Sequence, residues 1–251
     1  MDASEFWSIG DYSIVGELWS APGRELADSL EVADCDVIDL ATGTGVTAIA
    51  MARRGARSVV GVDAAAKLLA EAARRADAAG VEVNWIVGDV CSVPLPDRSA
   101  DLVVSTFGLI FAGDPAAAIA ECRRLTRHDG RVVFTSWSGQ GLFGRIRQAL
   151  SPYFPDEPEP WHETTAGIRA AIGDQTQTIE RSFVLDVASA EVFVSQLETH
   201  SAPFILAAES LGQQWEQARE ALVEVVLAAG DSNAGSYRAE VSYLVTTVAA
   251  A

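Results

Sequence analysis

The fold is decided by residues 37–50, which read Val37-Ile38-Asp39-Leu40-Ala41-Thr42-Gly43-Thr44-Gly45-Val46-Thr47-Ala48-Ile49-Ala50. An apolar run that ends in an acid is followed by a turn with two glycines and then by a helical pattern, so we predict a strand, a tight loop and a helix. Gly43 and Gly45 stand where the chain reverses and where a Cβ would hold a ligand away from the backbone. The helix that opens at Val46 points free N–H groups at the loop. The stretch therefore predicts a pocket for a nucleotide-like ligand.

The residues around the glycines narrow the choice of ligand. The spacing of Gly43, Gly45 and Ala48, followed by Asp63 at the end of the next apolar run, also satisfies the dinucleotide-binding fingerprint. Asp39, however, lies at the carboxyl end of the first strand, where the pyrophosphate of a dinucleotide would come close to its carboxylate. S-adenosylmethionine carries an ammonium and a sulfonium and no phosphate, so the loop suits it better than NAD. An ordinary turn without a ligand is the structural alternative.

Two further apolar runs along the chain also end in acids. Residues 57–63 predict a second strand that finishes at Asp63, and a helix over 64–79 is stopped by Gly80. Residues 81–87 predict a third strand, followed by Gly88-Asp89-Val90. The carboxylate of Asp63 can accept hydrogen bonds from two ribose hydroxyls, or it can cap the next helix. Three strands with an acid at the carboxyl end, where open parallel sheets bind ligands, are a much stronger signal than one glycine loop.

From about residue 36 to Trp137, these motifs resemble the class I S-adenosylmethionine-dependent methyltransferases, in particular small-molecule enzymes of the quinone-biosynthesis and type 11 kind of high-GC bacteria. The commonest loop of that family is acid-x-Gly-x-Gly-x-Gly. In this chain Ala41 occupies the position of the first glycine, and the quinone-type branch of the family tolerates alanine there. The resemblance implies that Asp89 accepts from the adenine amino group and that the N–H of Val90 reaches a ring nitrogen. It implies cofactor contacts at Asp39, Ala41, Thr42, Gly43, Gly45, Asp63, Ala64, Gly88, Asp89, Val90, Ser105, Phe107 and Tyr12.

The rest of the chain completes an α/β pattern. Residues 100–107 predict a buried fourth strand, Asp114-Pro115 begins a helix that runs to about residue 126, and residues 131–137 predict a fifth parallel strand. The family pattern then implies a Rossmann-like, doubly wound sheet of seven strands, mostly parallel with an antiparallel C-terminal strand. Beyond Trp137 we predict helices at 143–150, 163–172, 190–200 and 211–229, and strands at 176–187 and 237–248.

The chain is expected to form a single domain with three parts. Residues 1–34 are predicted to be a helical lid, residues 35–137 the cofactor-binding core, and residues 138–251 a helical cap with the closing antiparallel strands. The first part has one short helix within residues 1–10 and a second from about Pro22 to Leu30. Its aromatic residues, among them Trp7, Tyr12 and Trp19, are either core anchors or walls of the pocket.

Composition excludes several classes of partner. The net charge of −17 argues against nucleic acid, because phosphate binding needs clustered Lys and Arg. No long apolar run suggests a membrane span or a leader, so we expect a cytoplasmic protein with no membrane partner. Cys35, Cys91 and Cys122 are widely spaced without a His at ligand spacing, so no metal is expected. A homodimer is possible, and composition does not decide it.

The predicted activity is methyl transfer to a small, apolar or aromatic metabolite, such as O-, C- or N-methylation of a natural product or quinone. The enzyme's main contribution to such a displacement is to hold the acceptor in a dry pocket. Of the three histidines, His128 falls in a solvated turn, whereas His162 and His200 are the candidates for a catalytic base. The alternatives are a methyltransferase fold that serves as a cyclase or binding module and, less favoured, a nicotinamide-dependent oxidoreductase.

A flat apolar acceptor is suggested by the aromatic residues of the chain. They are Trp7, Phe107, Trp137, Tyr153, Phe154, Trp161 and Phe204.

Overall fold

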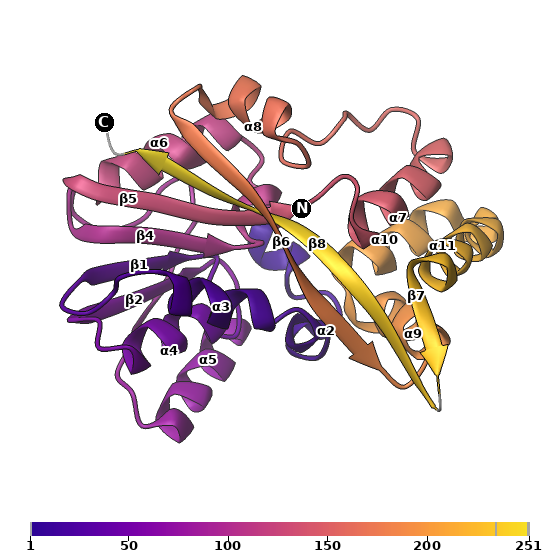
Figure 1. Ribbon diagram of the computed structural model, residues 1–251, viewed down its shortest axis with the longest axis horizontal. Helices are drawn as coiled ribbons and strands as arrows, with labels where there is room; N and C mark the ends of the chain where they lie inside the picture. The colour runs from indigo at the N-terminus through magenta and orange to yellow at the C-terminus, as the bar shows by residue number, and fades with distance from the viewer. Residues whose placement is uncertain (1, 234, 250–251) are drawn as a thin grey trace.

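A mixed sheet runs through the computed structural model, which describes residues 2–233 and 235–249 (Figure 1). Within these residues the sheet has eight strands in the order β3-β2-β1-β4-β5-β8-β6, with β7 paired to β8. The prediction of seven strands missed the short β7. Met1, Ala234, Ala250 and Ala251, which the predicted domain ranges include, lie outside the described residues. The strands are β1 (Asp36–Leu40), β2 (Ser58–Asp63), β3 (Asn84–Val87), β4 (Ala100–Thr106), β5 (Thr126–Trp137), β6 (Thr176–Val187), β7 (Gly230–Asn233) and β8 (Ser236–Ala249).

The first five strands are parallel and place their carboxyl ends along one edge. β1 lies between β2 and β4, and Asp39 is in register with Gly61 on one side and Val104 on the other. β3 continues the parallel pairing beyond β2, and β5 continues it beyond β4. The acids at the ends of β1 and β2 are therefore brought to the same edge of the sheet, as the sequence predicts.

The other half of the sheet is antiparallel. β8 pairs with β5 through its second half and with β6 along nearly its whole length, while β7 pairs with its first residues. β6 and β8 are long and project beyond the parallel strands, and helices gather around their projecting ends (Figure 1). These helices are α7 (Leu142–Leu150), α9 (Ala190–His200), α10 (Ala202–Leu211) and α11 (Trp215–Ala229).

Two apolar layers cover the parallel strands, because alternate residues of a strand point to opposite faces. Val37 of β1 packs with Met51 of α4 in one layer, and Ile38 packs with Ile119 of α6 in the other. Figure 1 shows α3, α4 and α5 on one side of the sheet and α6 and α8 on the other. These helices are α3 (Ala21–Ser29), α4 (Val46–Arg53), α5 (Ala66–Ala79), α6 (Pro115–Leu125) and α8 (Thr165–Ile172).

The N-terminal segment and the cap contain helices that the sequence analysis missed. Besides α1 (Ala3–Phe6), the structure has α2 (Tyr12–Leu18), whose first turn is capped by the carboxylate of Asp11. α2 packs against α5 of the core and α9 of the cap. The helix predicted over 211–229 corresponds to α11, which begins only at Trp215, and the preceding α10 was not predicted. Gly212, with a positive φ of 54°, separates the two helices.

Candidate active site

The loop after β1 is held in shape by the acid that precedes it. One carboxylate oxygen of Asp39, Oδ2, accepts from the Thr42 hydroxyl at 2.6 Å and from the N–H of Ala48 in the first turn of α4 at 3.1 Å. The side chain is buried, and burial raises its pKa to about 7. Asp39 therefore supports the loop from inside the protein. It does not line the cavity that lies on the other side of the loop.

Two residues that are not glycine adopt left-handed backbone conformations, with positive φ, beside this loop. Ala41 at the end of β1 has φ 51° and Phe107 at the end of β4 has φ 56°, in a region that costs an ordinary residue about 1–2 kcal/mol. A Cβ on Gly108 would lie only 2.3 Å from the Cβ of Ala41. Gly108, which the sequence analysis did not single out, therefore makes room for the alanine. Such strain concentrates at functional sites.

Asp63 connects the loop to the second strand. Its Oδ2 accepts from the N–H of Gly43 at 2.8 Å, and its Oδ1 accepts from the N–H of Ala65 at 2.9 Å. The N-cap position of α5 is taken by Ala65, so Asp63 precedes the cap. Burial raises the pKa of Asp63. Each carboxylate oxygen keeps a lone pair beyond its backbone bond, so the side chain can still accept from a ligand.

A cavity of about 270 Å³, here called the loop cleft, opens in front of these strand ends. It brings together most of the residues predicted to contact a cofactor, namely Tyr12, Ala41, Gly43, Asp63, Ala64, Gly88, Asp89, Val90 and Phe107. Its other walls include Trp7, which the sequence analysis offered as a wall of the pocket, and also Leu68, Cys91, Thr106, Gly108 and Phe111. The first helix and the turn after β4 supply several of them, and neither segment carries a motif in the sequence.

Four of the predicted contact residues do not line the loop cleft. Asp39 and Thr42 bond to each other behind it, as described above. A Cβ on Gly45 would meet Trp85 at 2.7 Å and Ala72 at 2.9 Å, so this glycine allows α4 to approach β3 and α5. Ser105 accepts from the N–H of Leu109 at 3.2 Å and shapes the turn that follows β4. Each of the four supports the loop or the strand ends.

α2 covers the glycine loop. The Tyr12 ring lies over Gly43, where a Cβ would come within 3.4 Å of it, and the Trp19 indole N–H donates to the Tyr12 hydroxyl at 3.2 Å. Trp7 contacts Tyr12 edge to face at 5.4 Å between ring centroids. Trp7 and Tyr12 of the N-terminal segment thus form a wall of the loop cleft.

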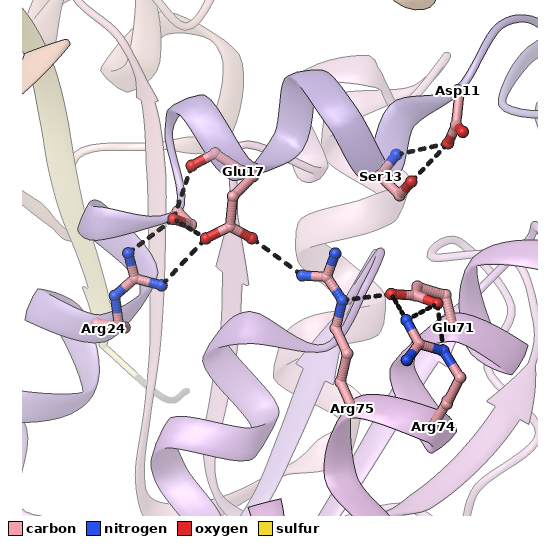
Figure 2. Close-up of polar contacts among 8 residues, drawn as sticks. Asp11, Ser13, Glu17, Arg24, Glu71, Arg74 and Arg75 are labelled. Atoms are coloured by element: carbon pink, nitrogen blue, oxygen red, sulfur yellow. Dashed lines mark hydrogen bonds and ion pairs between the residues drawn. The ribbon is translucent and has the colours of Figure 1, made fainter. Parts of the chain in front are cut away.

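A polar cluster ties α2 to the core (Figure 2). Glu17 of α2 forms an ion pair with Arg75 of α5 at 3.0 Å and a longer one with Arg24 of α3 at 3.7 Å. Arg75 is in turn fixed by Glu71, one turn earlier on α5, at 2.7 Å. The position of α2 over the loop is therefore set by charge as well as by packing.

A second, larger cavity of about 860 Å³, here called the aromatic chamber, adjoins the loop cleft. The two share Trp7, Tyr12, Phe107 and Phe111 as walls. Three rings on one side of the chamber are stacked, with Trp137 at 3.7 Å from Phe107 and at 4.1 Å from Phe143 between centroids. The aromatic walls are Phe6, Trp7, Tyr12, Trp19, Phe107, Phe111, Trp137, Phe143, Phe154 and Phe204. Of the aromatic residues named from the sequence, Trp161 packs against Phe134 instead, and Tyr153 does not line the chamber.

Charged side chains line the chamber on α7 and on the segment before α8. Arg147 is paired with both oxygens of Glu163, at 2.9 and 3.0 Å. His162 also lines the chamber, and the buried Nδ1 of its ring has no hydrogen-bond partner among the described residues. Burial and the charge of Arg147 lower the pKa of His162 to about 4. The imidazole is thus neutral near pH 7, and its free nitrogen can accept a hydrogen bond.

His200 lies elsewhere, at the end of α9. Its carbonyl accepts from the N–H of Asp11 at 3.2 Å, and it is not among the residues that line the chamber. His128 is exposed, as predicted, but it lies within β5 and not in a turn. The structure therefore brings one of the two histidines predicted to be catalytic to the chamber and leaves the other at the junction of α9 and α2.

The described part of the chain assembles no group of three or more His, Cys, Asp or Glu side chains that could hold a metal ion. Among residues 2–233 and 235–249, none of the helices combines the length and the apolar character that a membrane crossing needs.

Residues 37–130 match the family model described as a methyltransferase domain. An uncharacterized protein of Mycobacterium tuberculosis is 32% identical over 61% of this chain and 57% of its own length. A demethylmenaquinone methyltransferase of Thermus thermophilus is 36% identical over 51% of this chain and 59% of its own. The chain thus spans less than two thirds of the length of these relatives.

Among solved structures, the YcgJ protein of Bacillus subtilis shares the fold. The TM-score is 0.59 at 20% identity, and the match covers 91% of this chain and 98% of that one. The acids at the strand ends, the glycine loop and the matched family model lead to one assignment. Residues 37–130 of this chain belong to the methyltransferase domain family and form a class I S-adenosylmethionine-dependent methyltransferase domain.

Proposed function

We propose that this protein transfers the methyl group of S-adenosylmethionine to a small, apolar or aromatic metabolite of quinone-like or natural-product type. The observation that carries the proposal is the continuity of the loop cleft with the aromatic chamber through Trp7, Tyr12, Phe107 and Phe111. A cofactor in the cleft and an acceptor in the chamber would have these rings as a common wall. Binding two reactants side by side in a dry, preshaped site is the main requirement of methyl transfer.

The residues of the loop cleft suit the groups that S-adenosylmethionine carries. Asp63 and Asp89 offer carboxylates to hydroxyl and amino groups, and Leu68 offers an apolar surface to a flat ring. Gly43 leaves the backbone open to close approach. When bound, the cofactor supplies an electrophilic methyl group on a sulfonium. The chain's own task is then to bind, to orient and to exclude water.

The three predicted parts of the chain acquire roles in this proposal. Residues 1–34 act as a lid through α1 and α2, residues 35–137 bind the cofactor, and residues 138–251 form the cap over the acceptor. His162 is our candidate for the group that accepts a proton from a hydroxyl, phenol or enolisable carbon of the acceptor. The position of His200 favours a supporting role between α9 and α2.

Calorimetry tests the cofactor assignment. The full chain should bind S-adenosylmethionine and its homocysteine product, and Asp63→Ala should weaken that binding by about 1.5–3 kcal/mol because charge-assisted hydrogen bonds are lost. Asp186→Asn, in an exposed ion pair of β6 with Arg238, is a control that removes a carboxylate far from the cleft. Tight binding of NAD instead would contradict the proposal.

Turnover is tested by following the release of S-adenosylhomocysteine with a panel of hydroxylated aromatic compounds, quinols and amines. Release with the flat apolar members supports the proposal. Binding of the cofactor without release for any acceptor would favour the alternative of a methyltransferase fold that serves as a cyclase or binding module.

A further inference from the structure

Arg147 of α7 and Glu163 form a largely enclosed ion pair in the wall of the aromatic chamber. The Glu163 side chain is 7% exposed, and its two oxygens accept from Nε and Nη2 of the guanidinium at 2.9 and 3.0 Å. A bidentate pair of this kind fixes the plane of the guanidinium. The third nitrogen, Nη1, has no hydrogen-bond partner among residues 2–233 and 235–249, and protein atoms do not enclose it. Its hydrogens are therefore available to a ligand.

His162 precedes Glu163 in the chain and adds a hydrogen-bond acceptor to the same wall. In the part of the chain that the structure describes, its ring has no hydrogen-bond partner, and its Nδ1 is buried. Burial and the charge of Arg147 lower the pKa of the imidazole, so the ring is uncharged near neutral pH. A neutral imidazole has one nitrogen that accepts and one that donates. The chamber thus offers a fixed donor on Arg147 and an acceptor on His162.

The end of β5 and the turn after it hold these two side chains beside the stacked rings. The Ser136 hydroxyl donates to the His162 carbonyl at 2.8 Å, and the N–H of Gly139 donates to the Glu163 carbonyl at 3.0 Å. Trp137 lies between these two anchors in the chain, and its ring is the middle one of the stack. The polar groups are therefore fixed relative to the flat wall before a ligand binds, which reduces the cost of ordering them.

The stacked rings decide from which side a flat ligand reaches the guanidinium. Arg147 and Glu163 also line a groove of about 580 Å³, so the pair is part of the wall between the chamber and this groove. The three stacked rings line the chamber, and none of them lines the groove. A flat aromatic ligand therefore approaches Arg147 from the chamber.

The charges around Arg147 decide which chemical group suits its free nitrogen. Glu157 and Glu159 also line the chamber, and Glu159 lies 3.3 Å from the guanidinium. The hydrogen bonds to Glu163 and the charges of all three carboxylates raise the pKa of Arg147. Three negative charges thus surround one positive charge, so an anionic ligand group would be repelled. A neutral carbonyl oxygen can still accept a charge-assisted hydrogen bond from Nη1.

We propose that the acceptor is an uncharged, flat hydroxy-carbonyl compound whose carbonyl oxygen accepts from Arg147 and whose hydroxyl donates to His162. Glu163 is the positioning residue that orients the guanidinium for this bond. The inference rests on the proposed function, since it names the class of acceptor for the same chamber. The stacked rings bind the faces of such a compound, and the polar pair recognises its edge.

Three flat, rigid probes test the choice of group. 1-Hydroxyfluorenone has a hydroxyl and a carbonyl on one edge, 1-hydroxyfluorene lacks only the carbonyl, and fluorenone-1-carboxylate carries an anion in place of the hydroxyl. Calorimetry is done on the full chain saturated with S-adenosylhomocysteine. The wild type should bind the hydroxy ketone at least about tenfold more tightly than 1-hydroxyfluorene, as expected for a hydrogen bond to a charged group. The carboxylate should bind at least about tenfold more weakly than the hydroxy ketone.

Substitutions assign this preference to residues. Arg147→Lys keeps a positive charge beside Glu163 but loses the planar group with its third nitrogen, and should reduce the preference for the ketone to less than about twofold. Glu163→Gln should reduce it to about threefold, because the guanidinium is less firmly oriented. His162→Phe should weaken binding of both hydroxylated probes about equally and leave the preference unchanged.

Arg219→Lys is the matched control for Arg147→Lys. The Nε of Arg219 donates to both oxygens of Glu198 at 2.9 and 3.1 Å, and Arg219 lines neither the chamber nor the loop cleft. This variant should keep the full preference for the ketone. A preference that fell equally in both Lys variants would reflect a general loss of structure and would count against Arg147.

Each part of the inference can fail separately. Equal affinity of the wild type for the ketone and 1-hydroxyfluorene, or a preference that survives Arg147→Lys, would overturn the role of Arg147. An unchanged preference in Glu163→Gln would overturn its positioning role, and unchanged affinities in His162→Phe would overturn the role of His162. Tighter binding of the carboxylate than of the hydroxy ketone would overturn the choice of a neutral acceptor.

Failure of the proposed function would look different. A protein that binds S-adenosylhomocysteine but none of the three probes would overturn this inference and leave the cofactor assignment standing. A protein that does not bind S-adenosylhomocysteine would refute the proposed function before any probe is added.

Discussion

Ala41 and Gly108 lie at the ends of two neighbouring strands, β1 and β4, and are packed so closely that one methyl group fills the space between them. Ala41 sits in a left-handed conformation that favours glycine, yet it carries a Cβ, and this Cβ fills the space that Gly108 leaves open. The sequence shows that Ala41 departs from the usual loop, but it does not predict that Gly108 makes room for its Cβ. The partner lies on β4's end, far along the chain, so no local pattern connects the two.

Gly108→Ala should therefore damage the loop cleft. Its Cβ would come within 2.3 Å of the Ala41 Cβ and 2.9 Å of the Ser105 hydroxyl, and overpacking of this kind costs about 1–3 kcal/mol. We expect a lower free energy of unfolding together with weaker cofactor binding, measured by urea unfolding and calorimetry. Adding Ala41→Gly should restore part of both losses. A double variant no better than Gly108→Ala would show that the two residues do not constrain each other.

The raised pKa of Asp39 predicts that the stability of the cofactor-free protein depends on pH. Burial raises its pKa from 3.8 to about 7, so the folded state holds its proton over a range in which the unfolded chain has lost it. Stability should therefore fall as the pH rises from about 4 to about 7 and then level off. Asp39→Asn keeps an oxygen for Thr42 and Ala48, and should remove this part of the slope.

Urea unfolding of both proteins at pH 5 and pH 8 measures the effect of Asp39. The variant should gain stability relative to the wild type at pH 8. An identical change between the two pH values in both proteins would mean that Asp39 does not titrate as its burial implies.

At the scale of elements, the strands could be predicted and several helices could not. β1, β2 and β4 are rich in buried apolar residues, as is typical of parallel strands covered on both faces, and each has a turn signal after it. β7 has the sequence Gly-Asp-Ser-Asn and no strand propensity, and it is extended because β8 lies beside it. α2 is short and contains Gly16, so its place depends on the contacts it makes with α5 and α9.

The ion pair of Glu17 with Arg75 should matter for binding more than for stability. Both side chains are partly exposed, so the pair contributes only about 0.2–1 kcal/mol to folding. It nevertheless fixes α2, which carries Tyr12, over the loop cleft. Glu17→Gln should weaken cofactor binding about two- to fivefold and make it less sensitive to salt, because salt already screens the pair in the wild type.

Calorimetry at low and high salt tests the role of Glu17, with Asp186→Asn as a control that breaks an exposed pair on β6. A similar small loss of stability in both variants is expected. If both variants also lost the same amount of cofactor affinity, the ion pair of Glu17 with Arg75 would have no specific role in holding α2.

At the scale of the whole molecule, the protein holds two adjoining cavities with different origins. The loop cleft is built mainly from strand ends and the turns after them, so about half of its residues could be named from the sequence. The walls of the aromatic chamber come from α1, α2, α7, α10, the end of β5 and the proline-rich segment before α8. These residues are far apart in the sequence, and only the tertiary fold brings them together. The sequence suggested that the acceptor site is aromatic, but it did not predict how the rings are arranged.

Trp137 allows the two cavities to be separated by experiment, because it lines the chamber and not the loop cleft. Trp137→Leu keeps an apolar side chain but removes the flat surface stacked between Phe107 and Phe143. Aromatic pairs contribute about 0.5–1.5 kcal/mol beyond their buried area, so the KM of an aromatic acceptor should rise up to about tenfold. Cofactor affinity should stay within about twofold. A parallel loss of cofactor affinity would show that the stack supports both cavities.

The course of β8 has a consequence for the order in which the site is completed during synthesis. Trp137 ends β5, and its register partner is Tyr243 on β8, which emerges from the ribosome only after the entire cap has been made. The parallel strands and the glycine loop are all translated before that point, and chains fold from the N-terminus as they emerge. A nascent chain can therefore form its cofactor-binding half first, while the stacked wall of the chamber waits for the last strand to add itself to the sheet.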